Sequence, residues 1–196
     1  IGWVPDYVSL RLPGRCAVDT PSAPWTPLLS PARRRWSGAV LAQLGVRDDG
    51  LPDVLESGET IAALLPAAAE ELGLSKDVRL VSGAFDQAAA AHGASAAPGG
   101  RSVLSCGTAW VLYGVSGSPV VDPGLGVSGC CHGRAGEWGM VLPVSGGTVY
   151  DWARRTLAGE AAKTADSPNE PLIFIPHRYG GLSPDWRQES RGTIVG

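Results

Sequence analysis

Two short stretches of the sequence carry side chains that could do chemistry, and the first is VSGAFDQAAAAHGA at residues 81–94. Asp86 and Gln87 stand there between a strand-like run, VRLVSG, and an alanine-rich stretch that favours a helix. Ligands of α/β proteins bind where the carboxyl end of a strand meets the N-terminus of a helix. A carboxylate at that place can accept a proton from a substrate hydroxyl, so Asp86 is a candidate general base.

Asp86 also has a purely structural interpretation, as the N-cap of the helix that follows. An aspartate there accepts backbone N–H bonds and meets the positive end of the helix, which is worth roughly 1 kcal/mol. The two interpretations are compatible, and the residues alone do not choose between them.

The second stretch is Gly107-Thr108, between two apolar runs that favour strands. One interpretation is a tight hairpin turn. The other is a phosphate loop, in which glycine lets the backbone approach an anion and the threonine hydroxyl donates to its oxygens. The G-x-x-x-x-G-K-[ST] pattern is missing, so this is not a Walker-type loop.

Helical patterns dominate the segments before residue 94. Residues 33–46 predict a helix with Trp36, Val40, Leu41 and Leu44 on one face, ended by Gly45. In PAAAEELG, Pro66 suits a first helical turn and Gly73 suits the C-terminal cap. These helices lead to the short apolar strand VRLVSG.

Strand patterns dominate after AAPGGRS, residues 96–102, which is rich enough in Gly and Pro to mark a hinge. SVLSC and AWVLYGV flank the Gly-Thr turn, and LGVSGCCHG and EWGMVLPV flank RAG. Residues 146–159 then predict a helix with Val149, Trp152 and Leu157 inward. Antiparallel strands followed by a helix indicate an α/β fold and not an all-β sandwich.

Composition bounds the class of protein. The 196 residues are 44% hydrophobic and 18% charged, which is typical of a folded globular chain. A net charge of −3 argues against a nucleic-acid partner, and Arg33–Arg35, the only basic cluster, is expected to be a solvated edge. No apolar run approaches the roughly 20 residues that span a bilayer, so no membrane partner is expected.

The cysteines favour a reduced, cytoplasmic protein. Cys16, Cys106, Cys130 and Cys131 lack the paired spacing of a secreted disulfide framework. Cys130, Cys131 and His132 lack the C-x-x-C spacing and fourth ligand of a structural zinc site. No protein-held metal site is therefore expected.

Several motifs in order resemble the FGGY carbohydrate kinases, which belong to the actin-like, ribonuclease-H-fold ATPases. They are DYVSLRLPG at 6–14, AVD at 17–19, LPDVLESGETI at 51–61, G-x-x-D-Q ending at Gln87, the Gly-Thr turn, and FIPHRYGGLSPDW at 174–186 with RG at 191–192. The resemblance implies that residues 1–98 are the C-terminal part of the first, sugar-binding kinase domain. Residues 99–196 would then be the N-terminal part of the second, nucleotide-binding domain.

The resemblance also implies the chemistry. Asp86 would be the general base for a sugar or polyol hydroxyl that attacks the γ-phosphate of ATP, with Gln87 bonded to the substrate. Gly107 and Thr108 would form a phosphate turn, and Gly147 and Asp151 would line the nucleotide cleft. The implied cofactors are ATP and Mg²⁺.

The sequence departs from the family pattern at several positions, and these departures bear on whether the chain is active. Ala109 replaces the serine of G-T-S, Pro13 replaces the threonine of T-G, and Gly181-Leu182 replaces E-R of the late loop. No D-x-G-T loop precedes Ile1, and no Gly-rich adenosine segment follows Gly196. We therefore expect an incomplete and inactive portion of a kinase. The alternative is a non-catalytic binding or assembly module derived from the same fold; the sequence is compatible with a homo-oligomer.

Overall fold

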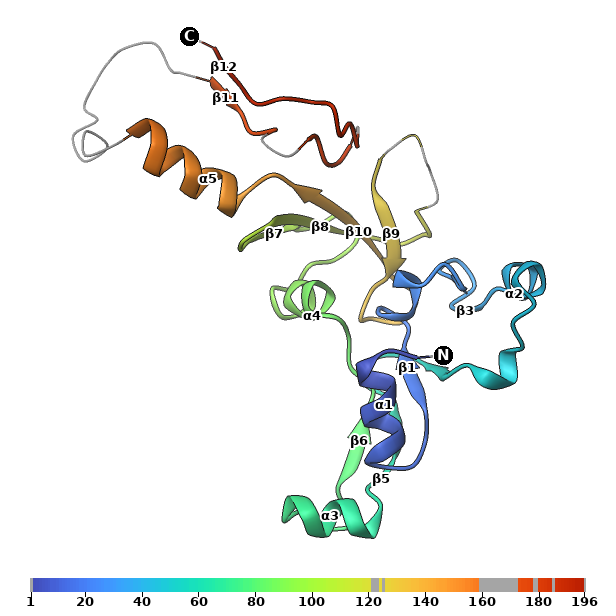
Figure 1. Cartoon of the computed structure of the whole chain (residues 1–196). Coiled ribbons are helices and arrows are strands. Elements are labelled where there is room, and N and C mark those ends of the chain that lie inside the picture. Colours follow the sequence, from blue (N-terminus) through green and yellow to red (C-terminus); the bar gives the residue numbers. More distant parts are fainter. Residues whose placement is uncertain are drawn as a thin grey trace. The chain divides into compact units, whose positions relative to one another are not determined.

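Short helices and strands alternate along the chain in the computed structural model (Figure 1), whose described residues are 2–120, 124, 126–158, 173–177, 180–184 and 186–195. The expected mixed α/β fold class is confirmed. The chain forms two compact units, each described by itself. The first comprises Ile1–Arg101, Gly114–Val121 and Gly129–Met140, and the second comprises Ser102–Tyr113, Asp122–Ser128 and Val141–Gly196. The division into kinase domains after residue 98 stays a prediction.

Most elements of the first unit are short and lie before residue 94. In chain order they are α1 (Val4–Arg11), β1 (Ala17–Asp19), η1 (Ala23–Trp25), β2 (Leu29–Ser30), β3 (Arg35–Trp36), α2 (Gly38–Leu44), η2 (Asp48–Gly50), β4 (Asp53–Leu55), β5 (Thr60–Ala63), α3 (Pro66–Leu72), β6 (Arg79–Val81) and α4 (Asp86–Gly93). Strands β1 and β4 pair in parallel, with Val18 opposite Val54. The pairs β2–β3 and β5–β6 are antiparallel.

A four-stranded sheet with the order β7-β8-β10-β9 follows, and the four strands expected after the hinge are confirmed. Their bounds are β7 (Val103–Cys106), β8 (Trp110–Ser116), β9 (Ser128–Cys131) and β10 (Trp138–Val144). Strands β7 and β8 are antiparallel, and Cys106 pairs with Trp110 across the Gly107-Thr108 turn. The expected hairpin is therefore present.

The remaining elements belong to the second unit: α5 (Gly147–Ala153), η4 (Arg154–Ala158), β11 (Ile173–Ile175) and β12 (Thr193–Val195). Strands β11 and β12 are antiparallel. Val149 of α5 is buried and Trp152 is half-buried, as expected for the inward face. The side chain of Leu157 and three residues of the late family motif, Arg178, Tyr179 and Asp185, lie outside the described residues.

Helix ends follow the local chemistry of the chain. Gly45 and Gly73 cap α2 and α3 in the left-handed conformation, with φ of 63° and 66°, which glycine adopts without steric cost. Pro66 occupies the first turn of α3. These three predictions are confirmed.

The helix expected over residues 33–46 is wrong at its start. Arg35 and Trp36 form β3, and α2 begins only at Gly38, because the Ser37 hydroxyl accepts a bond from the Val40 N–H at 3.5 Å and caps the helix there. The expected common apolar face is therefore incomplete: Leu41 is buried, but Leu44 is 59% exposed.

The core around the β1 strand is built from small and aliphatic side chains. Val18, Ala23, Leu29 and Cys131 form a buried cluster, and Trp36 and Val54 pack against it. The Trp36 indole N–H donates to the Pro52 carbonyl at 2.9 Å, which satisfies its polar atom. This cluster supports β1, whose last residue is Asp19.

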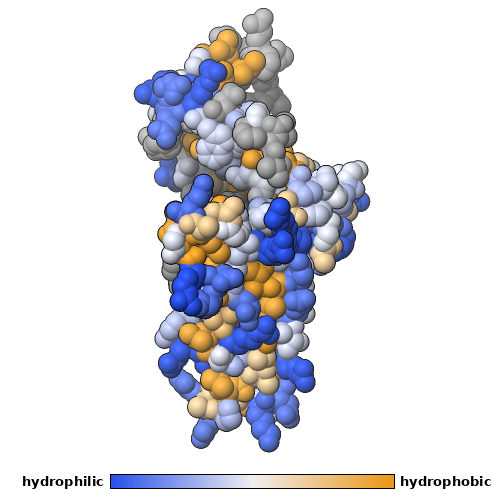
Figure 2. All heavy atoms as spheres, turned by 90° about the vertical axis from the view of Figure 1, so that its right-hand side faces the viewer, coloured by the Kyte–Doolittle hydropathy of each residue, from blue (hydrophilic) through white to orange (hydrophobic). Residues whose placement is uncertain are grey.

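Large apolar side chains are also exposed on α1, where Val4 and Tyr7 are 78% and 61% exposed. Figure 2 shows apolar surface interspersed with hydrophilic surface over one face of the described residues. Among those residues, no helix combines the length and the apolar character that crossing a membrane requires.

Candidate functional site

Asp86 stands at the first position of α4, directly after the loop that follows β6. Phe85, in an extended conformation, is the N-cap residue. The N-cap interpretation of Asp86 is therefore wrong by one position. Because Asp86 lies inside the helix, its carboxylate does not cap the backbone of the third helical residue.

The Asp86 carboxylate is held by its neighbour. One oxygen accepts the Gln87 backbone N–H at 2.9 Å and the other accepts the Gln87 side-chain amide at 3.0 Å, and Asp86 is exposed. A solvent-accessible carboxylate oriented by an amide can accept a hydroxyl proton.

In the second unit, the β7–β8 turn lies against the start of α5. The Thr148 backbone N–H donates to the Thr108 carbonyl at 3.1 Å, and the Thr148 hydroxyl lies 3.4 Å from the same oxygen. A Cβ on Gly146 would lie 2.0 Å from the Trp110 ring, so this position needs glycine. Gly146 and Gly147, which carry no side chains, thus let the β7–β8 hairpin and the start of α5 approach each other.

A cavity of about 380 Å³ opens at this junction. Its lining includes all four residues predicted to bind ATP phosphates: Gly107, Thr108, Gly147 and Asp151. The structure also adds Cys106, Trp110, Thr148 and Tyr150 to the lining. Thr148 follows Gly147 directly and offers a second hydroxyl, which the sequence motif could have indicated; nothing in the sequence singles out Trp110.

The chemistry of this lining suits a phosphate together with a cation. The Thr108 and Thr148 hydroxyls can donate to phosphate oxygens, and the glycines leave room for the backbone to approach them. The Asp151 carboxylate carries the same sign of charge as a phosphate. It can therefore contribute only through a bridging cation such as Mg²⁺, which prefers oxygen ligands.

Arg34 organises the first unit, contrary to the expectation that Arg33–Arg35 are a solvated edge. Arg33 and Arg35 are exposed, but the Arg34 side chain is only 13% exposed. Arg34 also has a φ of 52°, in the left-handed region. Sequence alone gave no sign of this difference between the three arginines.

The Arg34 guanidinium binds residues from three other parts of the unit. Its Nε donates to Glu56 Oε1 at 2.6 Å, its Nη2 donates to Glu56 Oε2, and further bonds reach the Thr20 hydroxyl and the Glu137 carbonyl. The bond from Arg34 holds the pKa of Glu56 below its ordinary value. Because Thr20 follows Asp19, this network fixes the end of β1.

Cys130, Cys131 and His132 are buried in the same unit. The Cys131 thiol donates to the Pro31 carbonyl at 3.6 Å, and burial raises its pKa to about 11. A buried thiol that stays neutral contributes to the packing of the unit. Among the described residues, no three metal-ligating side chains gather in one place.

Comparison with known proteins shows which family this chain resembles. Residues 1–93 match the FGGY family of carbohydrate kinases, N-terminal domain. Xylulose kinase of Klebsiella pneumoniae is 32% identical over 200 residues, which cover 97% of this chain and 41% of that enzyme. The chain thus spans about two fifths of the length of the curated relatives it matches.

The similar proteins of known structure include kinases named for two different substrates, xylulose and gluconate. Ligand-bound xylulose kinase from Lactobacillus acidophilus has a TM-score of 0.86 at 26% identity, and gluconate kinase from the same organism has 0.86 at 27%. Each match covers 97% of this chain and 41% of the other chain.

Proposed function

Because this chain belongs to the FGGY family of carbohydrate kinases, we propose that the protein transfers the γ-phosphoryl group of ATP to a hydroxyl of a sugar or polyol. One observation carries the proposal: the four residues assigned to ATP phosphates from the sequence line a single cavity. The cytoplasm is the proposed compartment, in keeping with cysteines that lack disulfide spacing.

In this reaction Asp86 accepts the proton of the substrate hydroxyl. The hydroxyl oxygen forms a bond to the γ-phosphorus, the bond from that phosphorus to the bridging oxygen breaks, and ADP leaves with the electron pair. The transition state is loose, so a weak base that is well placed suffices. The side-chain amide of Gln87 donates a hydrogen bond to the Asp86 carboxylate and so orients it. Gln87 is also the second residue that we expect to contact the substrate.

The phosphates of ATP are held by the turn and helix of the second unit. The hydroxyl groups of Thr108 and Thr148 donate hydrogen bonds to the phosphate oxygens. The backbone at Gly107 and Gly147 can approach the phosphates closely because neither residue carries a side chain. Mg²⁺, bound near Asp151, would neutralise charge on the phosphates.

The experiment is a measurement of ADP release by the longer kinase of which we expect this chain to be a portion, with xylulose, gluconate and glycerol as acceptors; the 196-residue chain alone is expected to be inactive. Asp86→Asn should lower kcat by about 10²–10⁴-fold, since general-base catalysis contributes that much. The matched control is Asp49→Asn, because Asp49 is an exposed acid paired with Arg47, and this control should retain full activity.

Circular dichroism of each variant separates the two roles of Asp86. A folded Asp86→Asn protein with unchanged turnover would overturn the assignment of the base. An unfolded Asp86→Asn protein would instead indicate a structural role. Absence of acceptor-dependent ADP release with every acceptor would contradict the proposed activity itself.

A further inference from the structure

Arg33 and Arg35, the exposed neighbours of Arg34, line one cavity of about 600 Å³ in the first unit. This volume is typical of small-molecule sites. The remaining lining residues are Ser30, Trp36, Ser37, Gly38 and Ala39. None of them has a role in the phosphoryl transfer proposed above, so the cavity offers chemistry that the kinase reaction does not use.

The β2–β3 hairpin brings these side chains together. Its strands are antiparallel with Ser30 opposite Arg35, and the side chains of such a cross-strand pair are neighbours. Residues 31–34 connect the strands, and across this connection the Arg33 N–H donates to the Ser30 carbonyl at 3.1 Å. Ser37 follows β3 directly and caps α2. Backbone hydrogen bonds therefore hold both arginines beside the two serines.

The protein leaves both of these positive charges unpaired. Among the described residues, the guanidinium groups of Arg33 and Arg35 form no ion pair and no hydrogen bond, and no acid lines their cavity. Other arginines of the unit do pair with carboxylates, namely Arg15, Arg34, Arg47 and Arg134. Two like charges in one cavity repel each other, and a bound anion would offset this repulsion.

Hydroxyl groups add to the hydrogen-bond donors of the cavity. The Ser37 oxygen accepts the Val40 N–H at 3.5 Å, which leaves the hydroxyl hydrogen free to donate to a ligand. Ser30 offers a second hydroxyl. Trp36 adds no donor, because its indole N–H is bonded to the Pro52 carbonyl at 2.9 Å. The cavity therefore combines positive charge with donors that suit an anion rich in oxygen.

A phosphate group matches this combination better than a carboxylate. The planar fork of an arginine binds two phosphate oxygens at once through charge-assisted bonds. A phosphate monoester carries about two negative charges near neutral pH and offers three free oxygens, which suffice for two guanidinium groups and further hydroxyls. A carboxylate brings one charge and two oxygens, so it would leave one of the two arginines without a partner.

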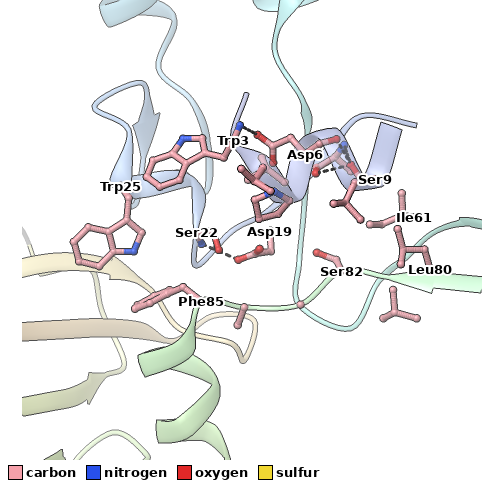
Figure 3. A pocket seen from close by; sticks show the side chains of 18 residues that line it. Trp3, Asp6, Ser9, Asp19, Ser22, Trp25, Ile61, Leu80, Ser82 and Phe85 are labelled. Carbon is pink, nitrogen blue, oxygen red and sulfur yellow. Dashed lines mark hydrogen bonds between the residues drawn. The ribbon is translucent and has the colours of Figure 1, made fainter. Parts of the chain in front are cut away.

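Another cavity of the first unit has the opposite charge. It is about 560 Å³ in volume and lies beside Phe85, among α1, β1, η1 and β6. Figure 3 shows Trp3, Trp25 and Phe85 around it, together with Asp6 and Asp19. These two acids are its only charged lining residues among those that the structure describes, so it disfavours a phosphate. Attraction of an anion is thus a property of the arginine-lined cavity.

We propose that the cavity between the β2–β3 hairpin and the start of α2 binds a phosphate dianion through Arg33 and Arg35, with Ser30 and Ser37 as further donors. The phosphate is either free or the ester group of a small metabolite. The site is separate from the residues assigned to phosphoryl transfer, and it does not depend on the proposed kinase activity.

The test is protection of arginines from phenylglyoxal, which modifies accessible guanidinium groups, with each arginine followed separately by peptide mass spectrometry. It uses the longer kinase of which we expect this chain to be a portion. At matched ionic strength, saturating glycerol 3-phosphate or inorganic phosphate should slow modification of Arg33 and Arg35 by about fivefold or more. Gluconate and glycerol, which lack a phosphate, should give no protection.

Arg79 is the internal control within the same samples. It is exposed, forms no ion pair among the described residues and lies outside the cavity, so its rate of modification should not change. The two phosphate compounds distinguish the source of the ligand. Protection at lower concentrations of glycerol 3-phosphate indicates a metabolite ester, and equal concentrations indicate that free phosphate suffices; both results support the site.

Arg35→Gln tests whether the two arginines act together. It should raise the concentration of glycerol 3-phosphate that half-protects Arg33 by about tenfold, because one charged donor is lost. Arg79→Gln removes the same charge outside the cavity and should leave this concentration unchanged.

Several outcomes would overturn the proposal. One is equal modification of Arg33 and Arg35 with and without both phosphate compounds, and another is equal protection by gluconate or of Arg79. Arg33 and Arg35 that fail to react even without a ligand would overturn it as well, because the cavity would then be closed. None of these outcomes bears on the assignment of Asp86, which the activity assay tests.

Discussion

Gly147 lies so close to Gly107 that a Cβ added to Gly147 would fall 2.1 Å from the Gly107 carbonyl oxygen. The atom in the way belongs to the backbone, so a rotamer change cannot relieve the overlap. Contact between the β7–β8 turn and the start of α5 therefore depends on the absence of a side chain at one position. The same contact shapes the cavity in which the phosphate-binding residues gather.

Gly147→Ala should destabilise the chain by about 1–3 kcal/mol, the usual cost of overpacking, because the turn and the helix must move apart. Because Trp110 lines the cavity, we expect Mg-ATP to change the tryptophan fluorescence of the protein, and Gly147→Ala should abolish that change. Urea unfolding and a Mg-ATP titration measure the two effects.

Gly38→Ala is the control for this substitution. Nothing lies within 4 Å of a Cβ at Gly38, which is the first residue of α2, so this variant should be neutral or slightly stabilising. Equal stability of the two variants would contradict the predicted clash.

Cys106 should report on occupation of the phosphate cavity. Its side chain is exposed and lines the cavity with Gly107 and Thr108. Mg-ADP should therefore slow alkylation of Cys106 by iodoacetamide by at least fivefold, as followed by mass spectrometry.

Two other cysteines serve as internal controls for the alkylation. Cys131 is buried with a pKa of about 11, so it should stay unmodified in the folded chain and react only in urea. Cys16, half-buried in the first unit, should react at a rate that Mg-ADP does not change. Alkylation of Cys106 at the same rate with and without Mg-ADP would speak against nucleotide binding at this cavity.

Arg34→Met should destabilise the first unit by about 2–4 kcal/mol, because it leaves the Glu56 carboxylate partly buried without its cationic partner. Arg35→Met removes the neighbouring exposed arginine and should change the unfolding free energy by no more than about 0.5 kcal/mol. Chemical unfolding of both variants makes the comparison. Equal losses would mean that Arg34 contributes no more to stability than Arg35.

The stability of the chain should depend on pH through Glu56. Its pKa in the folded chain lies below the ordinary value of 4.5 because Arg34 donates to its carboxylate. The unfolded chain therefore binds more protons in this range, and folding gains stability as the pH rises. The contribution is fully present above the ordinary pKa and is lost as the pH falls through the lowered one.

The measurement is the difference in unfolding free energy between the original chain and Glu56→Gln, taken across the acid range. This difference should be largest near neutral pH and should shrink as the acid protonates. Subtraction removes Asp6, whose raised pKa gives a dependence of the opposite sign. A difference that stays constant with pH would show that the Arg34–Glu56 pair contributes nothing specific to ionisation.

Several features of the fold could be predicted from the sequence because they depend on residues close together in the chain. Gly45, Gly73 and Pro66 mark helix ends because their backbone preferences act within a few residues. The β7–β8 hairpin was readable for the same reason. The gathering of Gly107 and Gly147 was expected only through the resemblance to known kinases, because no local rule connects a hairpin turn with a helix forty residues later.

Features that depend on distant partners escaped prediction. Arg34 differs from Arg33 and Arg35 through a left-handed backbone conformation and through acceptors far away in the sequence. Trp36 lies in a strand and not in a helix because it pairs with Leu29, and because Ser37 caps α2, which begins at Gly38. The cavity beside Phe85 joins α1, η1 and β6, and no single motif describes it.

The reach of Arg34 also sets the order in which the chain can fold during its synthesis. Arg34 donates to the carbonyl of Glu137, 103 positions downstream, and both residues belong to the unit that holds Asp86. A ribosome adds roughly 5–20 residues each second, so the Glu137 carbonyl is synthesised several seconds after Arg34. Asp86 itself emerges long before the unit around it is complete. A nascent chain stalled before residue 129 should therefore present its first helices and strands in an unfinished state, open to chaperones and proteases.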